Sequence, residues 1–499
     1  MKEIIGIVGA GIMGRGILQL FAQSGHKVLC FDAVEGAAEK AVEYVAGMIR
    51  RAVEKQKLSI SDGEATIARM SAVSTLAELS RCDVVVEAVV EELHVKRQLF
   101  AVLEGIVGEH AILASNTSSL LVSDIASGAR NPARIAGLHF FNPVPLMKVT
   151  EVVAAVHTSA VTLEALRTMV TATGHRAVVA ADQPGFLVNH AGRAYPTEAL
   201  QVLEERVADP EDIDALLREA AGFRMGPFEL LDLTGLDVSG KVMESIYEQF
   251  QGEPRYRPSS LVPPRVSAGL YGRKTARGWY AYENDKKVEK APRAIPPLPA
   301  NLSVWSDPHA ARHASLVALC TQAGVDLADR VAASLLLVQP WGTDATSHCA
   351  SHGLDASRTV AIDPLTEPGK RATLMLTVAT TVEARDAALA LLSVVGPVTV
   401  INDSPGFVVQ RVLAHVVNVA CGIAQRGIAS VADLESAVQL GLGYPHGPLA
   451  WGDRIGGARV LEILRNLEET TGDPRYRPTL WLRRRVALGL PLTTPEPTR

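Results

Sequence analysis

The chain has 499 residues and carries 49 Lys and Arg against 54 Asp and Glu, a formal net charge of −5. This length exceeds what one hydrophobic core supports, so several domains are expected, and without a long basic run nucleic acid is not an expected partner. No apolar run is long enough to span a membrane, and the five cysteines form no C-x-x-C pair. We therefore expect a cytoplasmic protein with no membrane partner, no disulfide framework and no metal site.

Residues 1–182 alternate short β-branched runs with longer amphipathic stretches, a pattern that predicts βαβ units and a parallel sheet. The expected strands are residues 4–8, 27–31, 83–87, 111–114 and 134–138. A crossover helix is expected from Ile12 to Ser24, and a pair of helical segments over 33–56. Beyond Pro184 the strand pattern is lost and helical spacing continues to Tyr282, which predicts an all-α second domain.

A glycine-rich G-x-G-x-x-G loop joins the first strand to the first helix. The loop and the start of the helix comprise Gly9, Gly11, Ile12, Met13 and Gly14. Gly9 permits the tight turn, Gly11 lets the backbone approach a pyrophosphate, and Gly14 allows close helix packing. Asp32 ends the second strand, where its carboxylate would bind an adenosine ribose and repel a 2′-phosphate. The context predicts NAD rather than NADP, and the alternative is a tight turn with a surface aspartate.

Two further groups of polar residues are candidates for chemistry. His139 lies near a strand end, and Glu151 lies close enough along the chain for its carboxylate to fix the imidazole tautomer. Oxidation of a hydroxyl to a ketone needs such a proton acceptor, although a lone histidine can also be structural. Residues 115–119 follow a predicted strand, either as the N-cap cluster of a helix or as ligand-binding groups at the sheet edge.

The helical domain is present twice in the chain. Residues 182–186, DQPGF, recur as residues 403–407, DSPGF, and residues 252–258, GEPRYRP, recur as residues 472–478, GDPRYRP. The first match is shifted by 221 positions and the second by 220. A run of matches at almost constant spacing predicts a duplicated domain.

Residues 309–402 read as a degenerate α/β segment, with apolar runs at 332–338 and 374–379. Val360 stands at the repeat position of His139, and no glycine-rich loop remains, so this segment is expected to bind no dinucleotide. The proline-rich composition before it is typical of a linker. The expected domains are 1–182 for NAD binding, 183–282 and 403–499 for the two helical copies, 283–308 for the linker and 309–402 for the degenerate segment.

Five separated motifs together resemble the L-3-hydroxyacyl-CoA dehydrogenase family. They are the loop at 9–14, DVVVEAVVE at 83–91 with Lys96, ASNTSS at 114–119, GLHFFNPVP at 137–145 and PGFLVN at 184–189. The resemblance covers residues 1–282, and residues 403–481 as a second C-terminal domain. It implies a Rossmann-like domain followed by duplicated all-α domains, and reversible NAD-dependent oxidation of an L-3-hydroxyacyl-CoA to the 3-oxoacyl-CoA.

The motif match also implies roles for individual residues. His139 would be the general base and Glu151 its orienting partner, while Ser118 and Asn189 would hold the reacting oxygen and the thioester side of the substrate. The positions that match the nicotinamide end of the cofactor site are Glu91, Lys96 and Asn116.

The two-copy layout, with NHAGR at 189–193 and FRMGP at 223–227, resembles the branch of this family that acts in phenylacetate degradation. Members of that branch oxidise 3-hydroxyadipyl-CoA to 3-oxoadipyl-CoA. Arg193 or Arg224 would bind the distal carboxylate of this substrate, and surface ion pairs are the alternative. Lys55 would meet the CoA phosphates, unless it belongs to a solvated helix face.

One active site per chain is expected, because Gln410 replaces Asn189 in the second copy and residues 272–280 have no counterpart after Leu490. In the single-copy family the helical domain pairs two subunits, so the duplicate is expected to form an internal pseudo-dimer, within a monomer or a homodimer. Two other functions stay open: a 3-hydroxybutyryl-CoA dehydrogenase of fatty-acid metabolism, and a non-catalytic NAD-binding scaffold.

Overall fold

A computed structural model describes residues 3–289, 291 and 293–497. The chain divides into two compact units: one holds the residues up to His190 together with Arg426–Leu442, and the other holds Ala191–Gln425 together with the residues from Gly443 onward. The division into functional domains stays a prediction, and each unit is considered by itself.

The described residues of the first unit form an eight-stranded sheet of order β3-β2-β1-β4-β5-β6-β7-β8, in which only the β6–β7 pair is antiparallel. Its strands are β1 (Ile4–Val8), β2 (Lys27–Phe31), β3 (Met70–Ala72), β4 (Val84–Glu87), β5 (Ile112–Ser115), β6 (Ile135–Phe140), β7 (Val149–Ala154) and β8 (Arg176–Ala181). The five predicted strands are confirmed to within about two residues. The sequence pattern did not identify three of the strands: β3 has only three residues, β7 carries polar residues inside its apolar run, and half of β8 is alanine.

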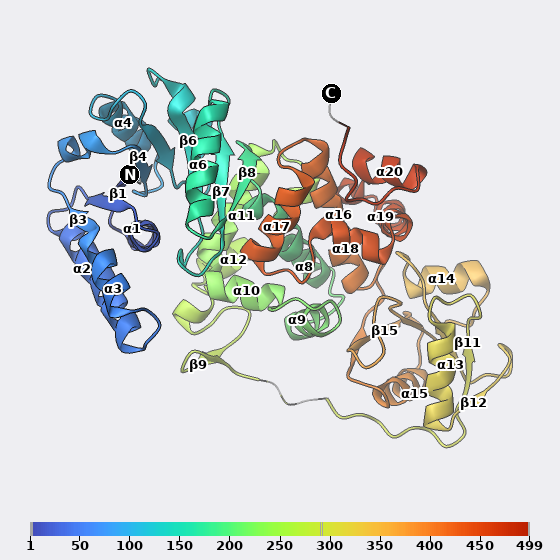
Figure 1. The fold of residues 1–499 in the computed structure, drawn as a ribbon. Helices are drawn as coiled ribbons and strands as arrows, with labels where there is room; N and C mark the ends of the chain where they lie inside the picture. The colour runs from blue at the N-terminus through green and yellow to red at the C-terminus, as the bar shows by residue number, and fades with distance from the viewer. Residues whose placement is uncertain (1–2, 290, 292, 498–499) are drawn as a thin grey trace. The chain divides into compact units, whose positions relative to one another are not determined.

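Helices cover both faces of this sheet (Figure 1). The helices of the unit are α1 (Ile12–Gln23), α2 (Ala37–Glu54), α3 (Ile60–Ala68), α4 (Leu93–Glu104), α5 (Val122–Ile125) and α6 (Ala160–Ala172). Apolar residues of α1, α2 and α6, such as Phe21 and Leu166, form the core on one face, and those of α4 and α5, such as Phe100, form the core on the other. The predicted pair of helical segments over 33–56 is wrong, because α2 runs unbroken and the second helix begins only at Ile60.

A segment of the second helical copy completes the first unit. Helix α17 (Val431–Leu442) packs against β7 and β8. The backbone N–H of Ala181 donates to the carbonyl of Ile428 at 2.7 Å, and Arg176 forms an ion pair with Asp433 at 2.9 Å. The end strand of the sheet is therefore covered by residues more than 240 positions later in the chain.

The described residues of the second unit include a six-stranded sheet of order β12-β11-β13-β14-β15-β16. Its strands are β11 (Ser303–Ser306), β12 (Asp326–Leu327), β13 (Leu335–Val338), β14 (Thr359–Ile362), β15 (Ala372–Leu376) and β16 (Val398–Ile401). Helices α13 (His313–Ala323) and α15 (Val382–Ser393) pack their apolar sides on it, and α14 (Ala345–His352) follows β13. An antiparallel β14–β15 pair followed by a parallel β15–β16 pair repeats the arrangement of β6, β7 and β8, which confirms the degenerate α/β segment.

Residues 283–308 are not uniformly extended. Strand β9 (Tyr282–Glu283) pairs with β10 (Lys286–Lys287), and β11 already belongs to the second sheet. The expected linker is thus shorter than its composition suggested.

Two sets of helices make up the rest of the second unit. The first copy contains α8 (Ala194–Glu204), α9 (Pro210–Glu219), α10 (Pro227–Thr234), α11 (Leu236–Gln249) and α12 (Val262–Ser267). The second contains α16 (Val409–Gln425), α18 (Pro448–Ile455), α19 (Gly457–Thr471) and α20 (Leu480–Ala487). Helix α7 (Val188–Gly192) precedes α8, and short 3₁₀ helices span Leu76–Arg81, Pro132–Arg134, Pro254–Tyr256, Arg273–Thr275 and Pro474–Tyr476.

The two helical copies contact each other reciprocally. Arg255 donates to the carbonyl of Arg477 at 2.7 Å, and its repeat equivalent Arg475 donates to the carbonyl of Arg257 at 3.2 Å. Arg257 pairs with Asp473, while Arg477 pairs with Glu253 at 3.6 Å, again the same contact with the copies exchanged. Reciprocal contacts are what a two-fold, self-complementary interface requires.

The C-terminal tail corrects one expectation about the second copy. In the first copy the Asp232 carboxylate accepts hydrogen bonds from the backbone of Trp279 and Tyr280 at 2.9 and 3.0 Å. The equivalent Asp453 accepts them from Leu492 and Thr493 at 2.5 and 3.2 Å. The expectation that residues 272–280 have no counterpart after Leu490 is therefore wrong, because a few tail residues provide the same two donors.

Among the residues that the structure describes, no helix has both the length and the apolar character that a membrane span requires.

Candidate active site

The glycine-rich loop has the shape that a pyrophosphate needs. Gly9 has a φ of +107°, and a Cβ added to it would lie 2.4 Å from the carbonyl oxygen of Ala88. A Cβ on Gly14 would lie 1.8 Å from the Gly9 carbonyl oxygen, whereas a Cβ on Gly11 would meet nothing within 4 Å. Gly9 and Gly14 are therefore required by packing, while the space beside Gly11, at the N-terminus of α1, is open for a ligand. These residues fit NAD.

Asp32 lies beside this loop, at the C-terminal end of β2. Its two carboxylate oxygens accept hydrogen bonds from the backbone of Ala10 at 2.7 Å and Val34 at 2.9 Å. These bonds hold the carboxylate where the adenosine ribose lies in this type of loop, which disfavours a 2′-phosphate there.

His139 and Glu151 form a buried pair. The antiparallel register of β6 and β7 places them directly opposite each other, and Glu151 Oε2 lies 2.5 Å from His139 Nδ1. The other carboxylate oxygen, Oε1, accepts from the backbone of Leu187 at 2.9 Å and Val188 at 2.8 Å. Glu151 is fully buried and His139 is 5% exposed. Because a carboxylate can only accept, Nδ1 carries a hydrogen, and in the neutral form of the ring the lone pair is then on Nε2.

Glu91 organises the 115–119 segment. Its Oε1 accepts from the hydroxyl of Thr117 at 2.7 Å and from the backbone of Ser118 at 2.9 Å, and its Oε2 lies 3.2 Å from Lys96 Nζ. Burial alone would raise the pKa of Glu91, but the Lys96 charge and these hydrogen bonds hold it below its usual value. The helix-cap interpretation of this segment is wrong, because α5 begins at Val122 with Leu121 as its N-cap.

Lys96 is buried, and it supports Glu91 rather than lining the cavity. Its ammonium donates to Glu87 Oε1 at 2.6 Å, and Ser115 donates to the other Glu87 oxygen at 2.7 Å. Glu87 was not among the predicted site residues, although a carboxylate at the end of a buried apolar strand is the sequence signal for such a role.

One cavity of about 360 Å³ in the first unit brings the candidate residues together. The candidates that line it are Met13, Glu91, Asn116, Ser118, His139 and Asn189. The Asn116 side-chain oxygen accepts from the backbone of Phe140 at 2.9 Å, which fixes Asn116 next to the residue after His139. Residues predicted for the cofactor and for the reaction therefore share one space.

The other predicted substrate residues lie outside this group. Lys55 is exposed at the end of α2. Arg193 and Arg224 belong to the second unit, where Arg193 is half-buried near Tyr444 and Arg224 is exposed beside Gly443. Burial lowers the pKa of Arg193 to about 10.

The equivalent position in the second copy is filled. The Gln410 side chain donates to Asp363 Oδ1 at 3.0 Å and accepts from the backbone of Gly342 at 2.8 Å. Asp363 is buried, which raises its pKa to about 6, and Val360 stands where His139 would be. The valine side chain cannot accept a proton, so the second copy has no counterpart of His139.

Comparison with known proteins agrees with this site. Residues 4–183 match the family described as "3-hydroxyacyl-CoA dehydrogenase, NAD binding domain", and residues 185–282 and 406–494 match "3-hydroxyacyl-CoA dehydrogenase, C-terminal domain". The two C-terminal matches agree with the duplication read from the repeat.

The chain is similar to full-length and to shorter relatives. It is 36% identical over 490 residues to 3-hydroxyadipyl-CoA dehydrogenase of Escherichia coli K12, covering 97% of this chain and 98% of that one. It is 38% identical over 283 residues to the mitochondrial hydroxyacyl-coenzyme A dehydrogenase of Sus scrofa, covering 56% of this chain and 90% of the relative. A crystal structure of 3-hydroxybutyryl-CoA dehydrogenase from E. coli K12 superimposes with a TM-score of 0.87 at 34% identity, covering 97% and 98% of the two chains. The chain therefore belongs to the 3-hydroxyacyl-CoA dehydrogenase family, as an enzyme with that family's NAD-binding domain.

Proposed function

We propose that the protein oxidises the 3-hydroxyl group of an L-3-hydroxyacyl-CoA to a ketone. The observation that carries this proposal is the shared cavity, where the His139–Glu151 pair lies beside Met13 of the glycine-rich loop. Asn116, Glu91 and Lys96 would shape the nicotinamide end, and Gly9, Gly11, Gly14 and Asp32 the adenosine and pyrophosphate end.

His139 would act as the base. Its Nε2 takes the proton of the substrate hydroxyl, and the Glu151 carboxylate stabilises the imidazolium that forms. NAD, when bound, accepts the hydride that leaves C3. Ser118 and Asn189 would hold the substrate oxygens, so that the hydroxyl lies within reach of the imidazole.

We propose 3-hydroxyadipyl-CoA as the preferred substrate. The similarity to the E. coli 3-hydroxyadipyl-CoA dehydrogenase over nearly the whole of both chains supports this choice. Arg193 or Arg224 would bind the distal carboxylate, and Lys55 the CoA phosphates. Alanine replacement of the arginine concerned should lower kcat/KM for 3-hydroxyadipyl-CoA more than for 3-hydroxyhexanoyl-CoA, and equal losses on both substrates would contradict this role.

The first test is NADH formation with 3-hydroxyadipyl-CoA and L-3-hydroxybutyryl-CoA in parallel, with His139→Ala as the control. A preference for the adipyl substrate that His139→Ala abolishes would support the proposal. A preference for the butyryl substrate would favour the second candidate, a 3-hydroxybutyryl-CoA dehydrogenase, which the similarity to a crystal structure of that title supports. No NADH with either substrate would leave an NAD-binding scaffold.

We also propose that the duplicated helical domains form an internal pseudo-dimer, so that a monomer suffices for activity. The reciprocal arginine contacts support it. Light scattering measures the size of the purified protein in solution. If it showed only species larger than a monomer, the proposal that a monomer suffices would be contradicted. A cytoplasmic location stays a prediction, which cell fractionation tests.

A further inference from the structure

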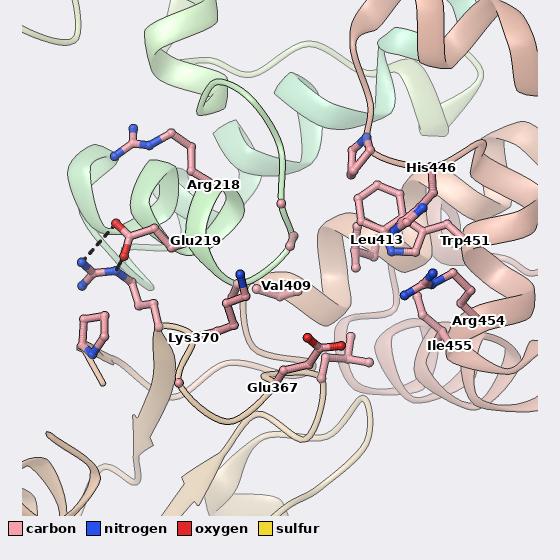
Figure 2. A pocket seen from close by; sticks show the side chains of 18 of the residues that line it. Arg218, Glu219, Glu367, Lys370, Val409, Leu413, His446, Trp451, Arg454 and Ile455 are labelled. Atoms are coloured by element: carbon pink, nitrogen blue, oxygen red, sulfur yellow. Dashed lines mark hydrogen bonds and ion pairs between the residues drawn. The ribbon is translucent and has the colours of Figure 1, made fainter. Parts of the chain in front are cut away.

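The second unit contains a cavity of about 560 Å³ that the proposed reaction does not use (Figure 2). It is bounded by the end of α9, the loop between β14 and β15, helix α16 and helix α18. Five cationic side chains line it: Arg218, Arg312, Lys370, Arg371 and Arg454. Its volume is in the range of small-molecule sites.

Some of these cations are neutralised within the protein. Arg371 donates to both carboxylate oxygens of Glu219, at 3.0 and 3.2 Å, and Arg218 pairs with Glu229 at 2.6 Å. These pairs shape the wall and leave little charge for a ligand.

Two of the remaining cations have no partner of their own among the described residues. Within the described part of the chain, neither Lys370 nor Arg454 has a hydrogen bond or ion pair from its charged group. Arg312 donates to the carbonyl of Pro364 at 2.7 Å, and its charge also acts on the buried Asp363 carboxyl. Apart from the paired Glu219, the lining has one carboxylate, that of Glu367. Lys370 and Arg454 against Glu367 give the lining a net positive charge.

The positive groups lie around an apolar floor. In Figure 2 the side chains of Lys370 and Arg454 lie on opposite sides of the cavity, Val409 and Leu413 lie between them in this view, and Ile455 lies next to Arg454. A bare inorganic anion would leave this apolar surface uncovered. A ligand with a negative group at each end of a short hydrocarbon chain would satisfy both features.

The Arg454 charge is particular to the second copy. At the repeat spacing of 221, Arg454 corresponds to Leu233, so the first copy has an apolar residue at this position.

We infer that this cavity binds a short-chain aliphatic dicarboxylate, with one carboxylate on Lys370, the other on Arg454 and the methylene chain over Val409 and Leu413. The site is separate from the His139 cavity, because the two cavities share no lining residue. The inference does not depend on the proposed reaction.

Calorimetric titration of the purified full-length protein with adipate tests the inference, with hexanoate and inorganic phosphate as comparison ligands. Loss of one charge-assisted contact weakens binding about 10- to 100-fold. Hexanoate, Arg454→Leu and Lys370→Met should each show a loss of that size, while Glu367→Gln should strengthen adipate binding because it removes a repelling charge. Arg465→Leu, an exposed arginine of α19 outside the cavity, is the matched control and should bind as the wild type does.

Circular dichroism and the melting temperature establish that each variant is folded. One outcome would place adipate at the proposed substrate arginines and overturn the inference: Arg193→Ala or Arg224→Ala abolishes binding, while Arg454→Leu and Lys370→Met preserve it. Equal binding of hexanoate, tighter binding of phosphate than of adipate, or no adipate binding by the wild type would also overturn it.

Discussion

Replacement of Glu151 by glutamine is the sharpest test of the proposed base. Glutamine keeps the size of the side chain, and its carbonyl oxygen can still accept from the backbone of Leu187 and Val188, as Glu151 Oε1 does. The amide nitrogen then faces His139 Nδ1, where the carboxylate oxygen now lies at 2.5 Å. The fold should therefore survive while the chemistry changes.

The expected loss follows from two effects on His139. An amide N–H facing Nδ1 makes that nitrogen the acceptor, so the ring hydrogen moves to Nε2, which can then no longer take a proton. The imidazolium also loses its buried counter-charge, and a hydrogen bond to a charged group is worth about 1.5–3 kcal/mol. A positioned general base contributes about 10²- to 10⁴-fold, so kcat should fall by about that factor with little change in KM.

The assay is the initial rate of NADH formation, with the melting temperature measured for each variant. Glu104→Gln is a matched control, because Glu104 is also a buried carboxylate that accepts from two backbone N–H groups, those of Arg130 and Asn131, but contacts no histidine. It should keep its activity. A Glu151→Gln protein that retains kcat within about threefold, or a Glu104→Gln protein that loses as much, would refute the reasoning.

Three further predictions concern the cofactor loop, the second copy and the interface. Gly11→Ala should weaken NAD binding, measured by fluorescence titration, without lowering the melting temperature, whereas Gly14→Ala should destabilise the fold because its Cβ would meet the Gly9 carbonyl. Burial raises the pKa of Asp363 to about 6 from an unfolded value of 3.8, so its ionisation penalises the folded state as pH rises through that range. Asp363→Asn should therefore raise stability at pH 7 by up to about 3 kcal/mol, and the gain should vanish below about pH 4 in thermal melts. Arg411 is buried against Glu198 at 2.9 Å, so Arg411→Met should lower stability by about 3–5 kcal/mol in denaturant titrations, and a neutral effect would contradict a buried, coupled ion pair.

Much of the site could be predicted from the sequence because its signals are local. The loop glycines, Asp32 and His139 each lie at the end of a strand that the apolar pattern identifies, and parallel strands bring such ends to one edge. Glu151 was found by its place after His139, and the β6–β7 register then placed it opposite the ring.

Other parts could not be predicted, because they depend on contacts between distant residues. The burial of Lys96 is an exception, because its partners Glu87 and Glu91 lie only nine and five positions earlier; what the sequence pattern did not show is that β4 and α4 bring the three charges together inside the protein. The cover of β8 by α17 depends on residues of the other copy. The tail donors to Asp453 were missed because backbone N–H groups can make the same contact from unrelated residues.

Duplication within one chain allows two repeat-equivalent contacts to be made by different residues, which a homodimer cannot do. In a homodimer, each reciprocal pair of contacts across the two-fold axis uses the same two residues. Here one contact joins the neutral ring of His190, whose pKa burial and Arg426 hold well below its usual range, to Arg426 at 3.1 Å. The repeat-equivalent contact joins Arg411 to Glu205 at 2.5 Å, with a full ion pair in place of the neutral partner. His190 follows the candidate substrate residue Asn189 directly, whereas Arg411 follows Gln410 in the copy without a base. Because the two contacts are encoded separately, the chain keeps a neutral histidine beside Asn189, while the opposite contact is an ion pair between the buried Arg411 and the partly exposed Glu205.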